Sequence, residues 1–121
     1  QLGVSGVKRE WDVYVSDKQD GFAVLDDEKG MHEPIDFAVR FSPRGAVERV
    51  EIVEYREAYG DEVRSKRFRD QFLGKTAADP IAVGQDIDVV SGASISSRSI
   101  AVGVKRDALV VEQALKSGQL P

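Results

Sequence analysis

The chain reads Ile35-Asp36-Phe37-Ala38-Val39-Arg40-Phe41 in its first half, and large apolar residues alternate strictly with polar or small ones over this stretch. Successive side chains of a β-strand point to opposite faces, so this period of two predicts a strand with one buried face. Such a strand needs partners beside it and a layer that covers its apolar face. The surrounding sequence supplies candidates for both.

Three other segments of the first half also predict strands, and polar turns separate them. Because the turns are short, an antiparallel meander of consecutive strands is favoured. In the last of these strands, Val50 and Ile52 are expected on one face, and Glu51, Val53 and Tyr55 on the other. The predicted strands are 11–15, 22–25 and 47–55, and the predicted connections are 16–21, 26–30 and 42–45.

The second half of the chain changes to a helical period. Residues 61–73 carry Val63, Phe68 and Phe72 among charged residues, which predicts a short amphipathic helix. Gly74 can end this helix.

The longest predicted element is a helix over residues 94–116. Its apolar residues recur at steps of three and four, which places them on one helix face, and Ser117 and Gly118 supply a stop signal. The sequence therefore predicts an α+β fold, in which one antiparallel sheet packs against this long C-terminal helix and a shorter helix, with residues 1–121 forming a single domain. The apolar face consists of Ile100, Val104, Ala108, Val111 and Leu115.

The amino-acid composition excludes several classes of function for this chain. The chain has 121 residues, 41% apolar and 31% charged, which is typical of one soluble globular domain. Its net charge of −4 argues against a nucleic-acid partner. The absence of cysteine excludes disulfides, cysteine-based zinc sites, iron–sulfur clusters and thiol nucleophiles, and the single histidine, His32, cannot build a multi-histidine metal site. No apolar run is long enough to span a bilayer.

The most informative stretch is Asp88-Val89-Val90-Ser91-Gly92-Ala93-Ser94, which joins a short extended piece predicted at 87–90 to the long helix. Gly92 permits a backbone turn that other residues resist. Ser94, Ser96 and Ser97 are candidate N-cap residues, and the free amides of a helix start favour a phosphate. Serine-rich starts are also common in ordinary helices, so spacing alone leaves both a phosphate site and a plain helix start open.

The same stretch resembles the flavinylation signature of the FMN-binding domain family, in which an Asp, two variable residues, Ser or Thr, Gly, Ala and a hydroxyl residue follow in this order. The resemblance continues in the helix at Ser96-Ser97-Arg98-Ser99 and in two upstream blocks, Glu54 to Gly60 and Gln71 to Lys75, and covers roughly residues 8–116. The family includes the C and G subunits of the sodium-pumping NADH:quinone reductase, their Rnf-complex relatives, the amino-terminal region of the nitrous-oxide reductase regulatory protein, and small stand-alone domains.

The resemblance implies FMN as the cofactor, joined by a flavin transferase through its phosphate to the last hydroxyl of the signature, here Ser94. The usual family acceptor is threonine, but serine offers the same nucleophile; non-covalent FMN at the same loop is the alternative. Asp88 is expected to serve the transferase or to order the loop. Ser91 and nearby backbone amides are expected to hold phosphate or ribityl oxygens. These amides belong to Gly92, Ala93, Ser94, Ile95 and Ser96.

Further site predictions lie upstream of the loop. Lys75 is expected to offset phosphate charge, with a solvated surface lysine as the alternative. Tyr59 is expected to lie against the isoalloxazine ring or to be a half-buried packing residue. Glu57 and Arg56 are expected to hydrogen-bond the ring edges or simply to form ion pairs on the surface. Trp11 is expected in the core.

Three functions remain open at this point. An electron carrier with covalent FMN would exchange electrons with redox partner proteins at the membrane or in the periplasm, because flavinylated family members mostly work outside the cytoplasmic membrane. The second is a flavin-dependent reductase, although so short a chain has little room for a nicotinamide pocket beside the flavin. The third is a flavin-free sensing or interaction module. The redox chemistry would be the flavin's, so no catalytic side chain is assigned. A membrane anchor in the full-length protein is left open.

Overall fold

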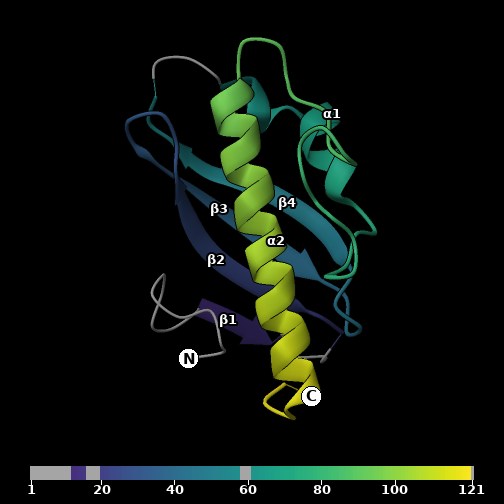
Figure 1. Cartoon of the computed structure of the whole chain (residues 1–121). Helices are drawn as coiled ribbons and strands as arrows, with labels where there is room; N and C mark the ends of the chain where they lie inside the picture. The colour runs from purple at the N-terminus through teal and green to yellow at the C-terminus, as the bar shows by residue number, and fades with distance from the viewer. Residues whose placement is uncertain (1–11, 16–19, 58–60, 121) are drawn as a thin grey trace.

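A four-stranded antiparallel sheet with one long helix across one face makes up the fold (Figure 1). The structure, a computed structural model, describes residues 12–15, 20–57 and 61–120; Trp11 lies outside them. The strands follow chain order across the sheet, so the predicted meander and the α+β class are confirmed. The elements are β1 (Asp12–Val15), β2 (Phe22–Lys29), β3 (Pro34–Phe41), β4 (Val47–Tyr55), the 3-10 helix η1 (Asp61–Arg64), α1 (Lys66–Arg69), the 3-10 helix η2 (Asp70–Phe72) and α2 (Ser94–Lys116).

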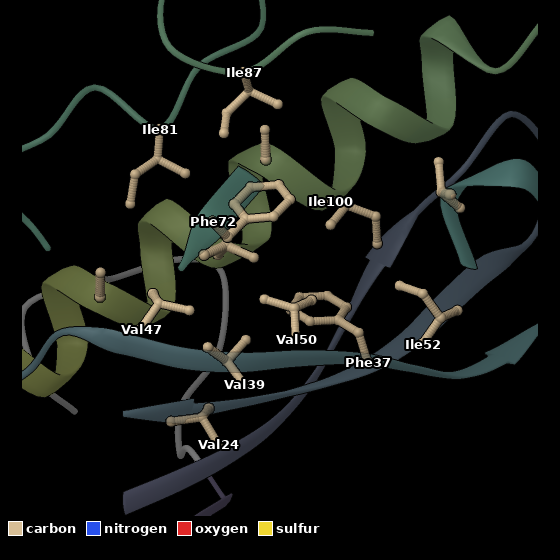
Figure 2. Close-up of a cluster of buried hydrophobic side chains, with 14 of the residues drawn as sticks. Val24, Phe37, Val39, Val47, Val50, Ile52, Phe72, Ile81, Ile87 and Ile100 are labelled. Atoms are coloured by element: carbon tan, nitrogen blue, oxygen red, sulfur yellow. The ribbon is translucent and has the colours of Figure 1, made fainter. Parts of the chain in front are cut away.

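The strand β3 supplies the centre of the buried face, as its alternation predicted. Ile35, Phe37, Val39 and Phe41 are at most 1% exposed. Figure 2 shows Phe37 and Val39 rising from the sheet toward the layer that contains Ile100 of α2. The sheet therefore buries one face against α2 and leaves the other face to solvent.

The strand β2 is longer than predicted, because it continues through Lys29 where the sequence indicated a loop over 26–30. Arg106 of α2 binds two acidic residues of this segment, Asp26 (Nη2 to Oδ2, 2.8 Å) and Glu28. The side chain of Asp26 is fully buried. A charge partner from a distant helix thus lets a polar segment enter the sheet, and polarity alone could not indicate this.

Two β-bulges set the faces of β4. The register between β3 and β4 shifts twice, so that Glu48 and Val53 are extra residues on β4. Because of the second bulge, Tyr55 pairs with Ile35 and packs partly buried against the core. The prediction that Tyr55 shares the outer face with Val53 is therefore wrong, since a period of two cannot anticipate an inserted residue.

The predicted helix over 61–73 is broken into the three short pieces η1, α1 and η2. Ser65 adopts an extended conformation (φ −64°, ψ 146°), and its hydroxyl accepts a hydrogen bond from the amide of Phe68 (3.2 Å). Ser65 therefore caps a new helix inside the predicted one. The apolar residues are nevertheless buried as expected, and Phe68 and Phe72 pack edge to face with ring centroids 5.4 Å apart.

The predicted extended piece at 87–90 does not form a strand. Ile87 is paired with Val83 in an isolated parallel bridge, and the residues that follow have no regular structure. Asp88 obtains its backbone partners from a side chain instead, that of Gln71.

The helix α2 has the bounds and the buried face that the sequence predicted. Four of the five predicted apolar residues are fully buried, and Leu115 packs partly buried against the core. Within the described part of the chain, no helix has the length and apolar character needed to cross a membrane. The single-domain assignment of residues 1–121 stays a prediction.

Gly103 lets α2 approach β3 closely, because a Cβ atom there would lie 2.4 Å from Cζ of Phe37. We expect Gly103→Ala to lower the free energy of unfolding by about 2 kcal/mol, since overpacking a rigid core usually outweighs the helix propensity that alanine adds. Urea unfolding would measure this. Val102→Ala, on the exposed side of the same turn, is the control and should change little. Equal stability of the two variants would contradict the proposed packing.

Candidate functional site

Most of the described residues predicted for the site lie at one end of the molecule, where α2 begins. The turn between β2 and β3, the end of β4 and η1 lie around this helix end (Figure 1). The hydroxyls of Ser96 and Tyr55 are 2.7 Å apart, and the hydroxyl of Ser99 donates to the carbonyl of Lys29 (2.8 Å). The start of α2 is thereby anchored to both β4 and β2.

The signature loop, residues 88–93, is held in place by side chains at two points. The amide of Asp88 donates to Oε1 of Gln71 (2.7 Å), and Nε2 of Gln71 donates to the carbonyl of Asp88 (3.1 Å). Two residues later, the amide of Val90 donates to Oγ of Ser97 (3.1 Å). The loop therefore has a defined shape before any cofactor is considered.

A tight turn closes the loop. The amide of Ala93 donates to the carbonyl of Val90 (2.9 Å), and Gly92 has a φ of +83°. Glycine adopts this left-handed conformation without strain, as at the third position of a type II turn. A Cβ atom at Gly92 would meet nothing within 4 Å, so open space lies next to the loop.

The helix α2 begins at Ser94 without a side-chain cap. Its N-cap residue is Ala93, and among the described residues no side chain forms a capping hydrogen bond at this helix end. The prediction that Ser94, Ser96 or Ser97 is the N-cap is therefore wrong: the Ser97 hydroxyl donates to the carbonyl of Ala93 (2.7 Å), and the Ser96 hydroxyl pairs with Tyr55. The uncapped amides and the positive end of the helix dipole favour an anion at this position.

Ser94 is exposed, and so are Ser91, Gly92 and Ile95. Ala93 between them is buried, at 3% exposure. The structure therefore brings together the exposed hydroxyl of Ser94, the open side of Gly92 and the uncapped amides of the first helical turn. An exposed hydroxyl in this position can be reached by a modifying enzyme, and a phosphate bound to it would stand beside the helix amides.

Glu57 lies at the same end, with its carboxylate engaged by backbone groups. Its Oε2 accepts hydrogen bonds from the amides of His32 and Glu33, the second at 3.1 Å, and so holds the turn between β2 and β3. These bonds, that of His32 foremost, hold the pKa of Glu57 below its usual value. Arg56 forms a surface pair with Asp36 (2.8 Å). A contact of Glu57 with the flavin stays a prediction.

Lys75 lies at the opposite end of β4 from the signature loop. Its carbonyl accepts a hydrogen bond from Val47, the first residue of β4, and its Nζ lies 3.2 Å from Oδ2 of Asp86. Burial opposes ionisation of Asp86, but two backbone amides and Lys75 outweigh it and lower the pKa of that carboxyl. The amine of Lys75 is therefore already paired. Tyr59 lies outside the described residues, so its contact with the flavin ring stays a prediction.

The sequence did not indicate two residues that hold the site in place, Gln71 and Tyr55. Both stood inside the upstream blocks of the family resemblance, which was the available signal. Their partners, Asp88 and Ser96, lie 17 and 41 residues further along the chain. No spacing rule connects such positions, so their roles emerged with the tertiary structure.

A groove of about 410 Å³ lies between β4 and α1, and no residue of the signature loop lines it. Its charged side chains pair with one another, as in Lys66 with Asp70 (2.5 Å) and Arg69 with Glu51 (3.3 Å). This groove is therefore separate from the start of α2, where the sequence predicts the cofactor.

An α+β domain whose long helix starts uncapped, behind a glycine turn and beside an exposed serine, is suited to hold the phosphate of a nucleotide cofactor. The chain belongs to the FMN-binding domain family: the family model matches residues 30–108, well over half of the chain. FMN is accordingly its cofactor, and the match includes the whole signature loop. No curated protein matches the chain. Across residues 12–15, 20–57 and 61–120, no group of three or more His, Cys, Asp or Glu residues could hold a metal ion.

Gly92→Val is expected to reduce FMN loading strongly. The reason is backbone strain, because a β-branched residue at a φ of +83° is strained by about 1–3 kcal/mol and would change the shape of the loop. Crowding within the protein is not involved, since no atom lies near the added Cβ. The FMN content per folded chain, measured by absorbance, tests this expectation.

The matched control for this variant is Gly118→Val. Gly118 has a φ of +78° and open surroundings, but it follows the C-terminal end of α2. Both variants carry similar local strain, but only Gly92 lies in the signature loop. FMN loading should therefore fall in Gly92→Val and not in Gly118→Val. An equal loss in both would mean that general destabilisation, and not the loop, controls loading.

Proposed function

We propose that this domain is an electron carrier whose FMN is attached through its phosphate to Ser94. The observation that supports this most directly is the exposed hydroxyl of Ser94 at the uncapped start of α2. Oγ of Ser94 would lose its proton and form a bond to the phosphorus of FMN, while the bond between that phosphorus and the leaving group of the transferase's FMN donor breaks. The net mass gain on the chain is FMN less one water. Non-covalent FMN in the same place is the alternative.

The other residues of the loop would bind and orient the cofactor. The first-turn amides of α2 and the hydroxyl of Ser91 would hold phosphate or ribityl oxygens, because helix amides carry partial positive charge. FMN itself supplies the redox chemistry, so no side chain of this chain needs to act as an acid, a base or a nucleophile during electron transfer. The exposed Asp88 is assigned to recognition by the flavin transferase.

An electron carrier is favoured over a reductase by the exposure of the site. Most residues of the signature loop, together with Ser94 and Ile95 at the start of the helix, are exposed on the surface, where a partner protein can approach the flavin. A reductase would need a second pocket for its own substrate beside the flavin. Oxidation of NADH by the isolated, FMN-loaded domain would favour the reductase instead.

The proposed function also implies a cellular location and redox partners for the protein. We infer an extracytoplasmic or periplasmic location, where a flavin transferase attaches the cofactor and redox proteins at the membrane or in the periplasm exchange electrons with it. Fractionation of the native host, with antibody detection of the flavinylated chain, would test the location.

The decisive experiment is the intact mass of the domain exported in a host that contains a flavin transferase, followed by peptide mapping. A gain equal to FMN less one water, on the peptide that contains Ser94, is the expected result. An unmodified mass with FMN still co-purifying would support the site and contradict the covalent bond. An unmodified and colourless domain would contradict the carrier function.

A further inference from the structure

The side chain of Gln71 makes a two-point contact with the backbone of the signature loop. Its Oε1 accepts from the amide of Asp88 (2.7 Å) and its Nε2 donates to the carbonyl of the same residue (3.1 Å). A primary amide offers one acceptor and two donors, so it can pair with both backbone groups of one extended residue, as a neighbouring strand would. Gln71 therefore supplies Asp88 with the two backbone hydrogen-bond partners that a neighbouring strand would otherwise provide.

Gln71 is itself held firmly. It lies in η2, between two aromatic residues of the core, and Phe68 and Phe72 are 1% and 0% exposed. Its Nε2 also lies 3.4 Å from the carbonyl of Phe68. The side chain of Gln71 therefore links the backbone of Asp88 to the packed core.

The contact fixes the backbone of Asp88 and leaves its carboxylate exposed. Both backbone groups of Asp88 are directed at Gln71, so the carboxylate needs no hydrogen bond of its own to order this residue. A carboxylate presented from a fixed backbone loses little conformational entropy when a partner protein binds it. Ser97 then holds Val90, so the chain enters the glycine turn in one conformation.

We propose that Gln71 is a positioning residue that presents Asp88 and the signature loop to the flavin transferase. This inference rests on the proposed function, because it assigns a purpose to a loop that is modified at Ser94. The hydrogen bonds of the Gln71 side chain go to the backbone of Asp88 and to the carbonyl of Phe68, so its proposed action is through the backbone of Asp88.

The expected effect follows from the two hydrogen bonds. Their loss releases the loop, and the transferase must then order it at each encounter. From the usual net strength of hydrogen bonds in proteins, we expect the loss of these two bonds to lower the rate of FMN attachment about tenfold or more when the transferase concentration is limiting. The fold of the domain should persist, because the core residues that flank Gln71 are unchanged.

Three variants test the proposal on the whole domain. Gln71→Met keeps the length of the side chain and removes both hydrogen bonds. Gln71→Glu loses the amide donor while it is ionised, and a protonated carboxyl regains one donor and one acceptor. Gln113→Met makes the same change at an exposed position near the other end of α2 and is the control.

Two readouts are needed, one of them without flavin. Nuclear magnetic resonance of the unloaded domain would follow the exchange protection and the chemical shift of the Asp88 amide. Intact mass would follow the rate of FMN attachment. We expect Gln71→Met to lose protection of the Asp88 amide by about tenfold and to slow attachment, whereas Gln113→Met should match the native chain on both counts.

The pH response separates positioning from a general structural role. In Gln71→Glu, the Asp88 amide signal should return toward its native position as the pH falls through the carboxyl titration, near about 4–5, because the protonated form restores the two-point contact. Gln71→Met keeps every carboxyl group of the native chain, including that of Asp88, but has no carboxyl at position 71, so it is the reference and should lack the additional return seen in Gln71→Glu. A general loss of stability would affect both variants alike.

The outcomes distinguish the failure of this inference from the failure of the proposed function. Native attachment rates in Gln71→Met, or native protection of its Asp88 amide, would overturn the inference and leave the function of Ser94 standing. If the native domain itself takes up no covalent FMN, the attachment proposal and the role of Gln71 in it both fall. Loss of protection together with slow attachment, confined to the Gln71 variants, supports the inference.

Discussion

Ser94→Ala is expected to remove covalent FMN completely and to leave the fold intact. The substitution deletes the exposed hydroxyl that would carry the phosphoester, and no other atom of the residue can replace it. Alanine is the best helix former, so the first turn of α2 loses nothing by the change. Intact mass of the domain from a host with a flavin transferase measures the loss, and thermal unfolding verifies the fold.

The matched variant is Ser94→Thr, which keeps the hydroxyl and adds one methyl group. Because Ser94 is an exposed residue, the added methyl group should meet little packing constraint, and attachment should persist. A covalent flavin on Ser94→Ala would place the attachment at another residue. If Ser94→Ala still binds FMN without a covalent bond, the signature loop retains its role as the phosphate site.

Arg106→Met is expected to cost the domain about 3–5 kcal/mol of stability, the range found when one member of a buried ion pair is removed. Arg106 is 11% exposed, and its guanidinium binds the fully buried carboxylate of Asp26 (2.8 Å) together with Glu28. Burial opposes the charge on Arg106, but its hydrogen bonds to the two carboxylates raise its pKa above the usual value. Methionine retains the apolar stem and leaves Asp26 without this charge partner.

Chemical denaturation of the apo domain measures this effect. Arg98→Met is the control, because Arg98 is an exposed arginine on the same helix and should change stability little. Pairing Arg106→Met with Asp26→Leu should regain part of the loss, because the buried carboxylate that had bound Arg106 is also removed. Similar unfolding midpoints for Arg106→Met and Arg98→Met would show that the ion pair adds no stability.

The sequence could not predict where polar residues find distant partners. It indicated a loop over 26–30, but Arg106 draws Asp26 into the sheet. It indicated a serine N-cap, but Ser96 and Ser97 are bonded to Tyr55 and to the loop, and Ala93 holds the cap position. These differences share one cause: a side-chain hydrogen bond or ion pair to a group outside the element itself outweighs a local preference of similar strength.

Local patterns by themselves determined the main elements of this protein. The period of two at 35–41 predicted the central strand, and the period near 3.6 predicted the buried face of α2. Ser117 and Gly118 indicated where α2 ends, and the signature at Asp88–Ser94 indicated FMN. These features depend on residues close together in the chain, where burial and spacing act directly. Only the tertiary structure decided that bulges turn Tyr55 inward and that Gln71 holds Asp88, because both depend on contacts between segments that meet after the chain has folded.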